Sequence, residues 1–236
     1  MMAKPPDLTF RSATLDDLDF VSWCNYASSS PSPGFCYWDP LLAGLGVETI
    51  TFIRRAVALD ALAWCRIADL VIAEDGPTPV AGAARFVMRE DDYRPLDLRQ
   101  VGALYDVLGW SAAQTVQFES RYAAVWSSPQ DETLRPSGAW TIESVAVAEH
   151  ARGRGVGTAL MKHIIGEARA AEIESLGVST TVGNAAAERL YLSVGFQRYI
   201  TFFSEYYGGG FPGAAKFRLR LEPGAIGSAS EPVAGR

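Results

Sequence analysis

The segment Arg152–Gly157 reads Arg-Gly-Arg-Gly-Val-Gly and could bind an anion. It lies between an apolar run, Trp140–Val147, and a helical stretch that starts near Thr158. The first N–H groups of a helix have no partners inside it, and the helix dipole adds partial positive charge there. Glycines let a phosphate approach those N–H groups, and arginines supply cationic donors suited to phosphate. The sequence therefore predicts a phosphate-binding turn between a strand and a helix.

The common nucleotide motifs do not fit this segment. A dinucleotide fingerprint needs a third glycine where Thr158 stands, and an acid after the next strand, which ends Ser-Thr-Thr-Val at Val182. A P-loop needs a Gly-Lys-Ser/Thr ending, which is absent. Two interpretations remain from the residues alone: an anion site of another kind, or a tight turn between strand and helix.

Glu143 is a carboxylate inside the otherwise apolar strand Trp140–Val147. Burial raises the pKa of a carboxyl, which suits a general base working near neutral pH. Period-two alternation predicts that Glu143 shares a face with Thr141 and Val145. It would take a proton directly or through a water. The alternative is a structural carboxylate paired with an arginine elsewhere in the sheet.

Two motifs together carry a family resemblance. Arg152, Gly155 and Gly157 match the pattern R/Q-x-x-G-x-G/A, and the segment resembles the coenzyme A pyrophosphate loop of the GNAT N-acetyltransferase superfamily. Further on, Asn184–Phe196 closely resembles the family's N-x-x-A-x-x-L-Y-x-x-x-G-F helix. The motifs occur in the family's order and separation, and the resemblance covers about residues 139–199.

The resemblance implies acetyl-CoA as the acyl donor and no metal. In the family the fourth strand diverges from the fifth, and the pantetheine arm bonds to the exposed main chain. The backbone N–H of Val145 is then a candidate oxyanion donor. The positions that match coenzyme-binding positions are Val145, Ala146, Val147, Arg152, Gly153, Arg154, Gly155, Val156, Gly157, Thr158 and Asn184.

The resemblance also implies a catalytic acid. Tyr191 matches the family tyrosine that lies near the coenzyme sulfur, and a phenol of pKa near 10 can protonate a thiolate of similar basicity. A core aromatic is the alternative for Tyr191, and a simple helix cap is the alternative for Asn184. No cysteine lies on the Glu143 strand or the Tyr191 helix, which favours direct transfer in a ternary complex.

Composition bounds the partners and the compartment. The 236 residues are 48% hydrophobic, and the net charge is −6 with a pI near 5.0, which argues against nucleic-acid binding. Cys24, Cys36 and Cys65 have no C-x-x-C spacing and form no even disulfide set. The sequence has neither a signal-peptide core at its start nor an apolar run of membrane-span length. These features predict a cytoplasmic protein with no membrane partner.

The fold expected from the resemblance is α/β (α+β). It has a GNAT-like mixed, mostly antiparallel central sheet of six to seven strands flanked by helices. We expect one domain over residues 1–222 and a flexible tail over 223–236, which is rich in Pro, Gly, Ser and Ala. An earlier helix is predicted over Glu48–Arg66. The aromatic loop segment Phe35–Trp38 is predicted to contribute one or two side chains to an acceptor pocket.

An insertion of nearly fifty residues, about 90–138, separates the third and fourth strands. It is predicted to form two helices that break at Gly109–Ser111, pack beside the sheet, and shape the acceptor site or a dimer contact. A lid and a solvated appendage are the alternatives. The apolar residues at helical spacing are Val101, Leu104, Tyr105 and Leu108, then Val116, Tyr122, Val125 and Trp126.

The sequence therefore predicts an acetyl-CoA-dependent N-acetyltransferase that transfers acetyl directly to a primary amine. The alternative is a non-catalytic acyl-CoA-binding sensor of the same fold. The presence of both Glu143 and Tyr191 favours the enzyme, since a sensor is free to lose them. The acceptor is open, with a small molecule favoured over a protein. A longer acyl chain, and a monomer or a homodimer, are equally compatible with the sequence.

Overall fold

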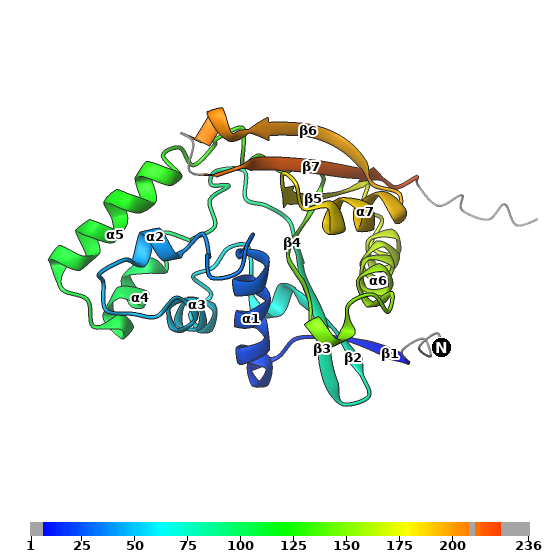
Figure 1. Ribbon diagram of the computed structural model, residues 1–236, viewed down its shortest axis with the longest axis horizontal. Coiled ribbons are helices and arrows are strands. Elements are labelled where there is room, and N and C mark those ends of the chain that lie inside the picture. Colours follow the sequence, from blue (N-terminus) through cyan, green and yellow to red (C-terminus); the bar gives the residue numbers. More distant parts are fainter. Residues whose placement is uncertain (1–6, 208–210, 223–236) are drawn as a thin grey trace, which may run out of the picture.

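The computed structural model describes residues 7–207 and 211–222. Its centre is a seven-stranded sheet with the order β1-β2-β3-β4-β5-β7-β6 (Figure 1). Every neighbouring pair is antiparallel except β4 and β5, which confirms the expected mixed, mostly antiparallel α/β fold. The strands are β1 Leu8–Ser12, β2 Leu70–Asp75, β3 Thr78–Phe86, β4 Trp140–Val147, β5 Ser175–Thr181, β6 Gln197–Phe203 and β7 Gly213–Arg220.

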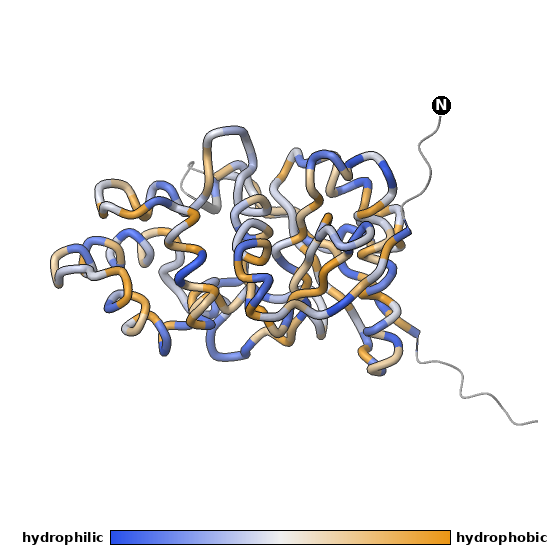
Figure 2. The backbone as a smooth tube through the Cα atoms, turned by 90° about the horizontal axis from the view of Figure 1, so that it is seen from below, coloured by the Kyte–Doolittle hydropathy of each residue, from blue (hydrophilic) through white to orange (hydrophobic). Residues whose placement is uncertain are grey.

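Helices cover both faces of this sheet. The helices are α1 Leu18–Ser28, α2 Asp39–Leu42, α3 Thr49–Ala58, α4 Val101–Leu108, α5 Ala112–Val125, α6 Val156–Ala170 and α7 Ala185–Ser193. One apolar cluster lies between the sheet and α6 with α7, and the other is formed by α1 to α5 against the opposite face. Figure 2 shows that hydrophobic stretches are distributed along the whole of the described backbone. None of these described helices is long and apolar enough to cross a bilayer.

The insertion forms two helices that break where the sequence predicts. Gly109 ends α4 in the left-handed region (φ 65°), a conformation that glycine adopts without steric cost. Ser111 then caps α5, with its hydroxyl accepting from the backbone N–H of Gln114 at 3.4 Å. This turn chemistry is local, and it therefore could be predicted from sequence.

The packing of the insertion differs from the prediction. Its helices join the apolar cluster on the α1 side of the sheet, but they pack mainly on other helices, α4 on α3 and α5 on α2 (Figure 1). Val116 and Val125 are 64% and 53% exposed, whereas Phe118 is fully buried. Phe118, and not Val116 or Val125, faces the core because it fills an aromatic cluster. This cluster comprises Trp38, Phe52, Tyr105, Trp110, Phe118, Tyr122 and Trp126.

Helix α3 is shorter than predicted. It ends at Ala58 and not at Arg66, and Asp60 follows with a positive φ of 53°. The chain after α3 instead pairs with the start of the insertion, because Asp97 N–H donates to the Ala61 carbonyl at 2.8 Å and Ala63 N–H donates to Pro95 at 2.8 Å. A contact between segments so far apart overrides local helical periodicity.

Asp97 anchors this junction. Its carboxylate is almost fully buried and forms ion pairs with Arg66, Arg89 and Arg99. The guanidinium of Arg99 is the main reason that the pKa of Asp97 falls to about 2. The anchored junction fixes where the insertion leaves the sheet. The predicted tail over 223–236 lies outside the described residues.

Candidate active site

The glycine-rich turn has the geometry of an open anion cradle. Helix α6 begins at Val156, two residues earlier than predicted, and Gly155 caps it with a positive φ of 81°. Gly153 also has a positive φ, 72°. A Cβ added at either glycine meets no atom within 4 Å, so the space above the N-terminus of α6 is open. Gly157 differs, because its Cβ would lie 3.2 Å from Leu190.

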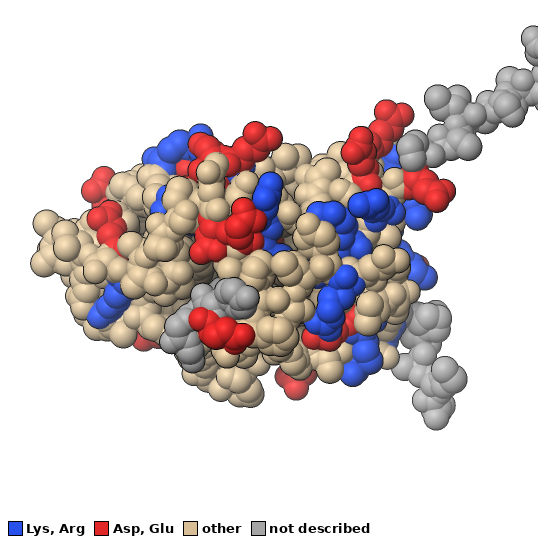
Figure 3. Space-filling view, turned by 90° about the horizontal axis from the view of Figure 1, so that it is seen from above, with Lys and Arg blue, Asp and Glu red and all other residues tan. Residues whose placement is uncertain are grey.

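Both arginines of the turn already have partners. The Nε of Arg152 donates to the Val147 carbonyl at 3.1 Å, at the end of β4. The guanidinium of Arg154 forms a 2.9 Å ion pair with Asp75 at the end of β2. Figure 3, a view from above, shows Lys and Arg side chains interspersed with Asp and Glu side chains over that face of the molecule. The turn therefore contains two guanidinium groups, each already bonded to a protein oxygen.

Strands β4 and β5 part beside this turn. They pair in parallel at only three positions, the last being Ile142 with Val178. Beyond that point β5 continues to pair with β7, while residues 143–147 of β4 have no partner on β5. The main chain of Val145, Ala146 and Val147 therefore lines the place where the strands diverge. Coenzyme binding by these residues, and by Val156 and Thr158 at the start of α6, stays a prediction.

A β-bulge in β4 changes which residues share a face. Ala84 pairs with Glu143 and Gly82 with Ala146, so β4 has one extra residue, and Ser144 has a positive φ of 55°. The prediction that Glu143 and Val145 share a face is wrong. Val145 packs with the apolar cluster under α6, while Glu143 stays on the side of α1. The bulge shifts the alternation by one residue, which simple period-two counting cannot anticipate.

Glu143 is partly buried and makes no ion pair with an arginine in residues 7–207 and 211–222. The hydroxyl of Ser179 on β5 donates to its Oε1 at 3.1 Å. Desolvation raises the pKa of Glu143 to about 7, against the lowering effects of Ser179 and of the Lys216 charge. A carboxyl that titrates near neutral pH can act as a general base there.

Tyr191 is 3% exposed and lies among the rings of Phe196 and Phe217. Burial raises the pKa of its phenol above the usual value, and the charge of Glu143 adds to this rise. The hydroxyl therefore keeps its proton at neutral pH and can donate it. Packing and proton donation are compatible here, because the ring packs while the hydroxyl remains protonated.

Asn184 caps α7. Its side-chain oxygen accepts from the backbone N–H of Ala187 at 3.1 Å. This cap holds the first turn of the helix that carries Tyr191, so Asn184 helps to position Tyr191 relative to β4. Contact between Asn184 and a coenzyme arm stays a prediction.

Three residues that the sequence analysis did not select lie close to Glu143. Ser179 donates to it, Lys216 lies opposite Ser179 across the β5–β7 pair, and Cys65 lies near enough for the Glu143 charge to affect it. Burial raises the pKa of the Cys65 thiol to about 12. The one sequence signal for Lys216 is its type, because Lys4, Lys162 and Lys216 are the only lysines among the 21 Lys and Arg.

The segment Phe35–Trp38 divides between two environments. The hydroxyl of Tyr37 forms a 2.9 Å hydrogen bond with Thr181 at the end of β5, and Phe35 packs edge-on against its ring. Trp38 instead points into the aromatic cluster and is buried there. Tyr37 is therefore the member that reaches the sheet near the parting strands.

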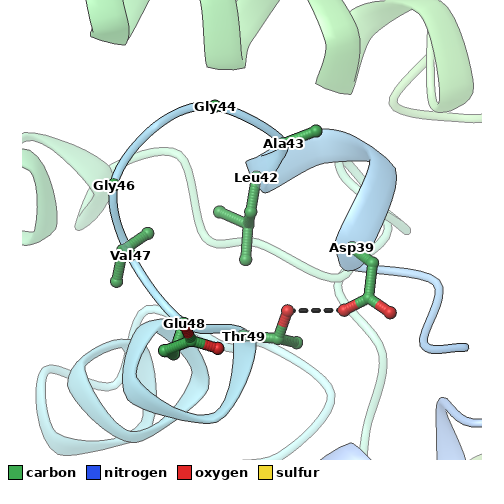
Figure 4. A pocket seen from close by; sticks show the side chains of 8 residues that line it. All are labelled: Asp39, Leu42, Ala43, Gly44, Gly46, Val47, Glu48 and Thr49. Carbon is green, nitrogen blue, oxygen red and sulfur yellow. Dashed lines mark hydrogen bonds between the residues drawn. The ribbon is translucent and has the colours of Figure 1, made fainter. Parts of the chain in front are cut away.

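Two surface hollows lie away from these residues. One, of about 300 Å³, is formed by the turn between α2 and α3, where Thr49 donates to Asp39 at 2.5 Å (Figure 4). The other, of about 520 Å³, lies at the start of β4 beside Gly138 and Arg218, at the opposite end of that strand from the glycine turn. None of the predicted site residues lines either hollow. In the described parts of the chain, no group of three or more His, Cys, Asp or Glu could hold a metal ion.

Comparison with known proteins gives a family and a fold. The family described as "Acetyltransferase (GNAT) family" matches residues 53–196. No curated protein matches the sequence significantly.

Solved structures resemble the chain over nearly all of its length. An N-acetyltransferase from Staphylococcus aureus Mu50 aligns with a TM-score of 0.58 at 15% identity, covering 89% of this chain and 100% of that one. A ribosomal-protein-alanine N-acetyltransferase from Brucella melitensis gives 0.52 at 19%, covering 90% and 99%. The protein yncA from Salmonella typhimurium, solved with its cofactor acetyl-CoA, gives 0.50 at 16%, covering 94% and 98%. At these identities the similarity shows a shared fold.

Proposed function

The chain belongs to the GNAT acetyltransferase family, and from this membership we propose that it is an acetyl-CoA-dependent N-acetyltransferase acting on a primary amine. The observation that carries the proposal is the combination of two features at one place. Strands β4 and β5 part after Ile142, and the open glycines 153 and 155 stand at the N-terminus of α6 beside them. The acetyl-CoA in the Salmonella yncA structure supports the choice of donor.

The residues present fit this donor. The open space at Gly153 and Gly155 leaves room for phosphate oxygens against the first N–H groups of α6, with Arg152 and Arg154 nearby. The unpaired edge of Val145–Val147 offers main-chain groups to a pantetheine arm. When bound, acetyl-CoA supplies an acetyl group activated as a thioester.

The roles of the side chains follow from their environments. Glu143 accepts the proton that the amine loses, because its pKa near 7 leaves much of it ionised at neutral pH. Tyr191, which keeps its proton, donates to the departing sulfur. The N–H of Val145, beside the bulge at Ser144, is the proposed donor to the carbonyl oxygen as it gains negative charge.

Direct transfer is favoured over an acyl-enzyme. Cys65 is the thiol near Glu143, but it is fully buried and its pKa of about 12 leaves almost no thiolate at neutral pH. A thiol in that state is a poor nucleophile. The amine therefore attacks the thioester itself.

The acceptor is proposed to be a small-molecule amine. The Brucella structure is named for a protein substrate, but at 19% identity it shares only the fold with this chain. Tyr37, tied to the end of β5 through Thr181, is the proposed aromatic wall of the acceptor site. A non-catalytic acyl-CoA sensor remains the competing function.

Free-thiol release from acetyl-CoA across a panel of primary amines tests the proposal. We expect at least one amine to accelerate thiol release above the rate without amine, and mass spectrometry to find the acetylated amine. Calorimetric binding of acetyl-CoA, with no amine able to stimulate thiol release, would favour the sensor. A lack of binding would reject both functions.

A further inference from the structure

Three polar side chains form a row across three adjacent strands. Ser179 on β5 donates to Glu143 on β4 at 3.1 Å. Lys216 on β7 is the register partner of Ser179, so its side chain leaves the same face of the sheet. The row therefore joins a buried cation to the carboxylate across one intervening strand, even though the residues are distant in sequence.

Lys216 is an unusual group to bury. It is 5% exposed, and its ammonium has one hydrogen bond within the described residues, to the carbonyl of Arg135 at 2.6 Å. The ring of Phe202 lies 5.9 Å from its nitrogen. An ammonium has three N–H donors, so a single acceptor leaves the burial cost largely uncompensated unless nearby negative charge offsets it.

The titratable side chains near the pair are Tyr191, Cys65, Asp131 and Glu132. The charge of Lys216 on β7 lowers the pKa of Glu143. The charge of Glu143 in turn raises the pKa of Tyr191 on α7 and of Cys65. Burial lowers the pKa of Lys216 to about 8, against the raising effects of the charges of Glu143, Asp131 and Glu132. Since Tyr191 and Cys65 are neutral at pH 7, Lys216 is the nearby cation that favours an ionised Glu143.

We propose that Lys216 is a positioning residue for the base: its buried ammonium, held by the Arg135 carbonyl, keeps Glu143 in the carboxylate form that accepts the proton of the amine. The inference rests on the proposed role of Glu143. The proton moves from the attacking nitrogen to Glu143, and Lys216 keeps its own proton throughout.

Carboxyl titration of Glu143 by 13C NMR tests the coupling without any substrate. Lys216→Met keeps an unbranched side chain suited to burial and removes the charge. We expect the titration midpoint of Glu143 to rise by roughly one pH unit. Lys162→Met removes one charge from the exposed face of α6 and is the matched control, in which the midpoint should stay unchanged. An unchanged midpoint in folded Lys216→Met would overturn the proposal.

The reverse measurement serves if Lys216→Met does not fold. Coupling between two titrating groups is mutual, so Glu143→Gln should lower the titration midpoint of Lys216 by a similar amount. The chain has three lysines, so lysine-selective labelling gives a simple spectrum. An unmoved Lys216 midpoint in folded Glu143→Gln contradicts the coupling.

The pH–rate profile separates the inference from the proposed function. The acidic limb of kcat/KM in Lys216→Met should move upward by the same amount as the Glu143 midpoint. A shifted carboxyl titration with an unshifted acidic limb would mean that Lys216 and Glu143 interact but that the interaction serves no proton transfer. If no amine is acetylated by the wild type, the proposed function fails, and the NMR titrations still decide the coupling.

Discussion

Glu143 is partly buried and Tyr191 is buried, and the loss of water around each acts on them in complementary ways. It brings the carboxyl close to half-ionised at neutral pH and keeps the phenol fully protonated. One group can therefore take a proton while the other gives one. Two titratable groups with such different protonation states in one region are what acid–base chemistry at neutral pH requires.

Glu143→Gln should lose activity and gain stability. The amide keeps an acceptor for the Ser179 hydroxyl but cannot take a proton, so kcat/KM should fall roughly 100-fold and the acidic inflection near pH 7 should disappear. The folded carboxyl has a raised pKa, so the wild type loses stability as pH rises from the ordinary value, 4.5, through about 7. The variant should therefore be more stable at pH 8 by roughly 1–2 kcal/mol in urea unfolding. Persistence of the inflection in the variant would point to another base.

Tyr191→Phe should separate packing from proton donation. The ring contacts with Phe196 and Phe217 remain, so folding and coenzyme affinity should hold. The lost proton donor should lower kcat roughly 100-fold with little change in the Kd for acetyl-CoA. Wild-type turnover across the pH range would assign Tyr191 to packing alone.

The candidate site is formed by irregular parts of a strand and by the end of a helix. The strand β4 contributes a bulge at Ser144 and an unpaired edge, and α6 contributes its N-terminus behind Gly153 and Gly155. Regular strand and helix geometry would close both places, because β4 would pair fully with β5 and side chains would cover the helix end.

The same substitution should have different effects at a glycine of the turn and at a glycine further along α6. Gly155→Ala places a Cβ in the open cradle at a positive φ, so acetyl-CoA affinity should fall at least about 10-fold and stability by about 1 kcal/mol. Gly166→Ala, further along α6, also adds a Cβ that meets no atom within 4 Å, and it is the matched control with unchanged affinity. Calorimetry with acetyl-CoA measures both. Equal affinities for the two folded variants would contradict the placement of phosphate at residue 155.

Local signals predicted much of these elements, and long-range contacts account for the failures. The turn at Arg152–Gly157 and the break at Gly109–Ser111 depend on glycine and capping residues, which are visible in sequence. The early end of α3 depends on pairing with residues 95–97, and the bulge depends on the register with β3. The place of Lys216 beside the candidate site could not be predicted, because Ser179 and Glu143 become its neighbours only when the sheet forms.

At the scale of the whole molecule, the insertion completes a second core. Phe118 from α5 packs against Phe52 of α3, and Trp126 packs against Trp38 beside α2. Removing residues 90–138 would uncover Phe52 and Trp38, both of which are buried. The insertion is therefore part of the body that supports α1 and α3, and point variants test it better than a deletion.

Phe118→Ala should destabilise the protein by roughly 3–5 kcal/mol, because it leaves a cavity in the aromatic cluster. Val116→Ala, on the exposed side of the same helix, is the control and should change stability by less than about 0.5 kcal/mol. Acetyl-CoA affinity of the folded Phe118→Ala protein should match the wild type, since the cluster lies away from the glycine turn. Equal unfolding midpoints for the two variants would show that the insertion is a loosely attached appendage.

The three cysteines have a practical consequence for measurement. Cys24, Cys36 and Cys65 are all completely shielded from solvent, and burial raises the pKa of each thiol. A thiol reagent in the assay solution should therefore report released coenzyme without background from the native enzyme. Any slow additional reaction of the reagent, up to three equivalents per chain, would come from the cysteines and would measure how often the protein opens. The same assay would therefore record turnover and unfolding.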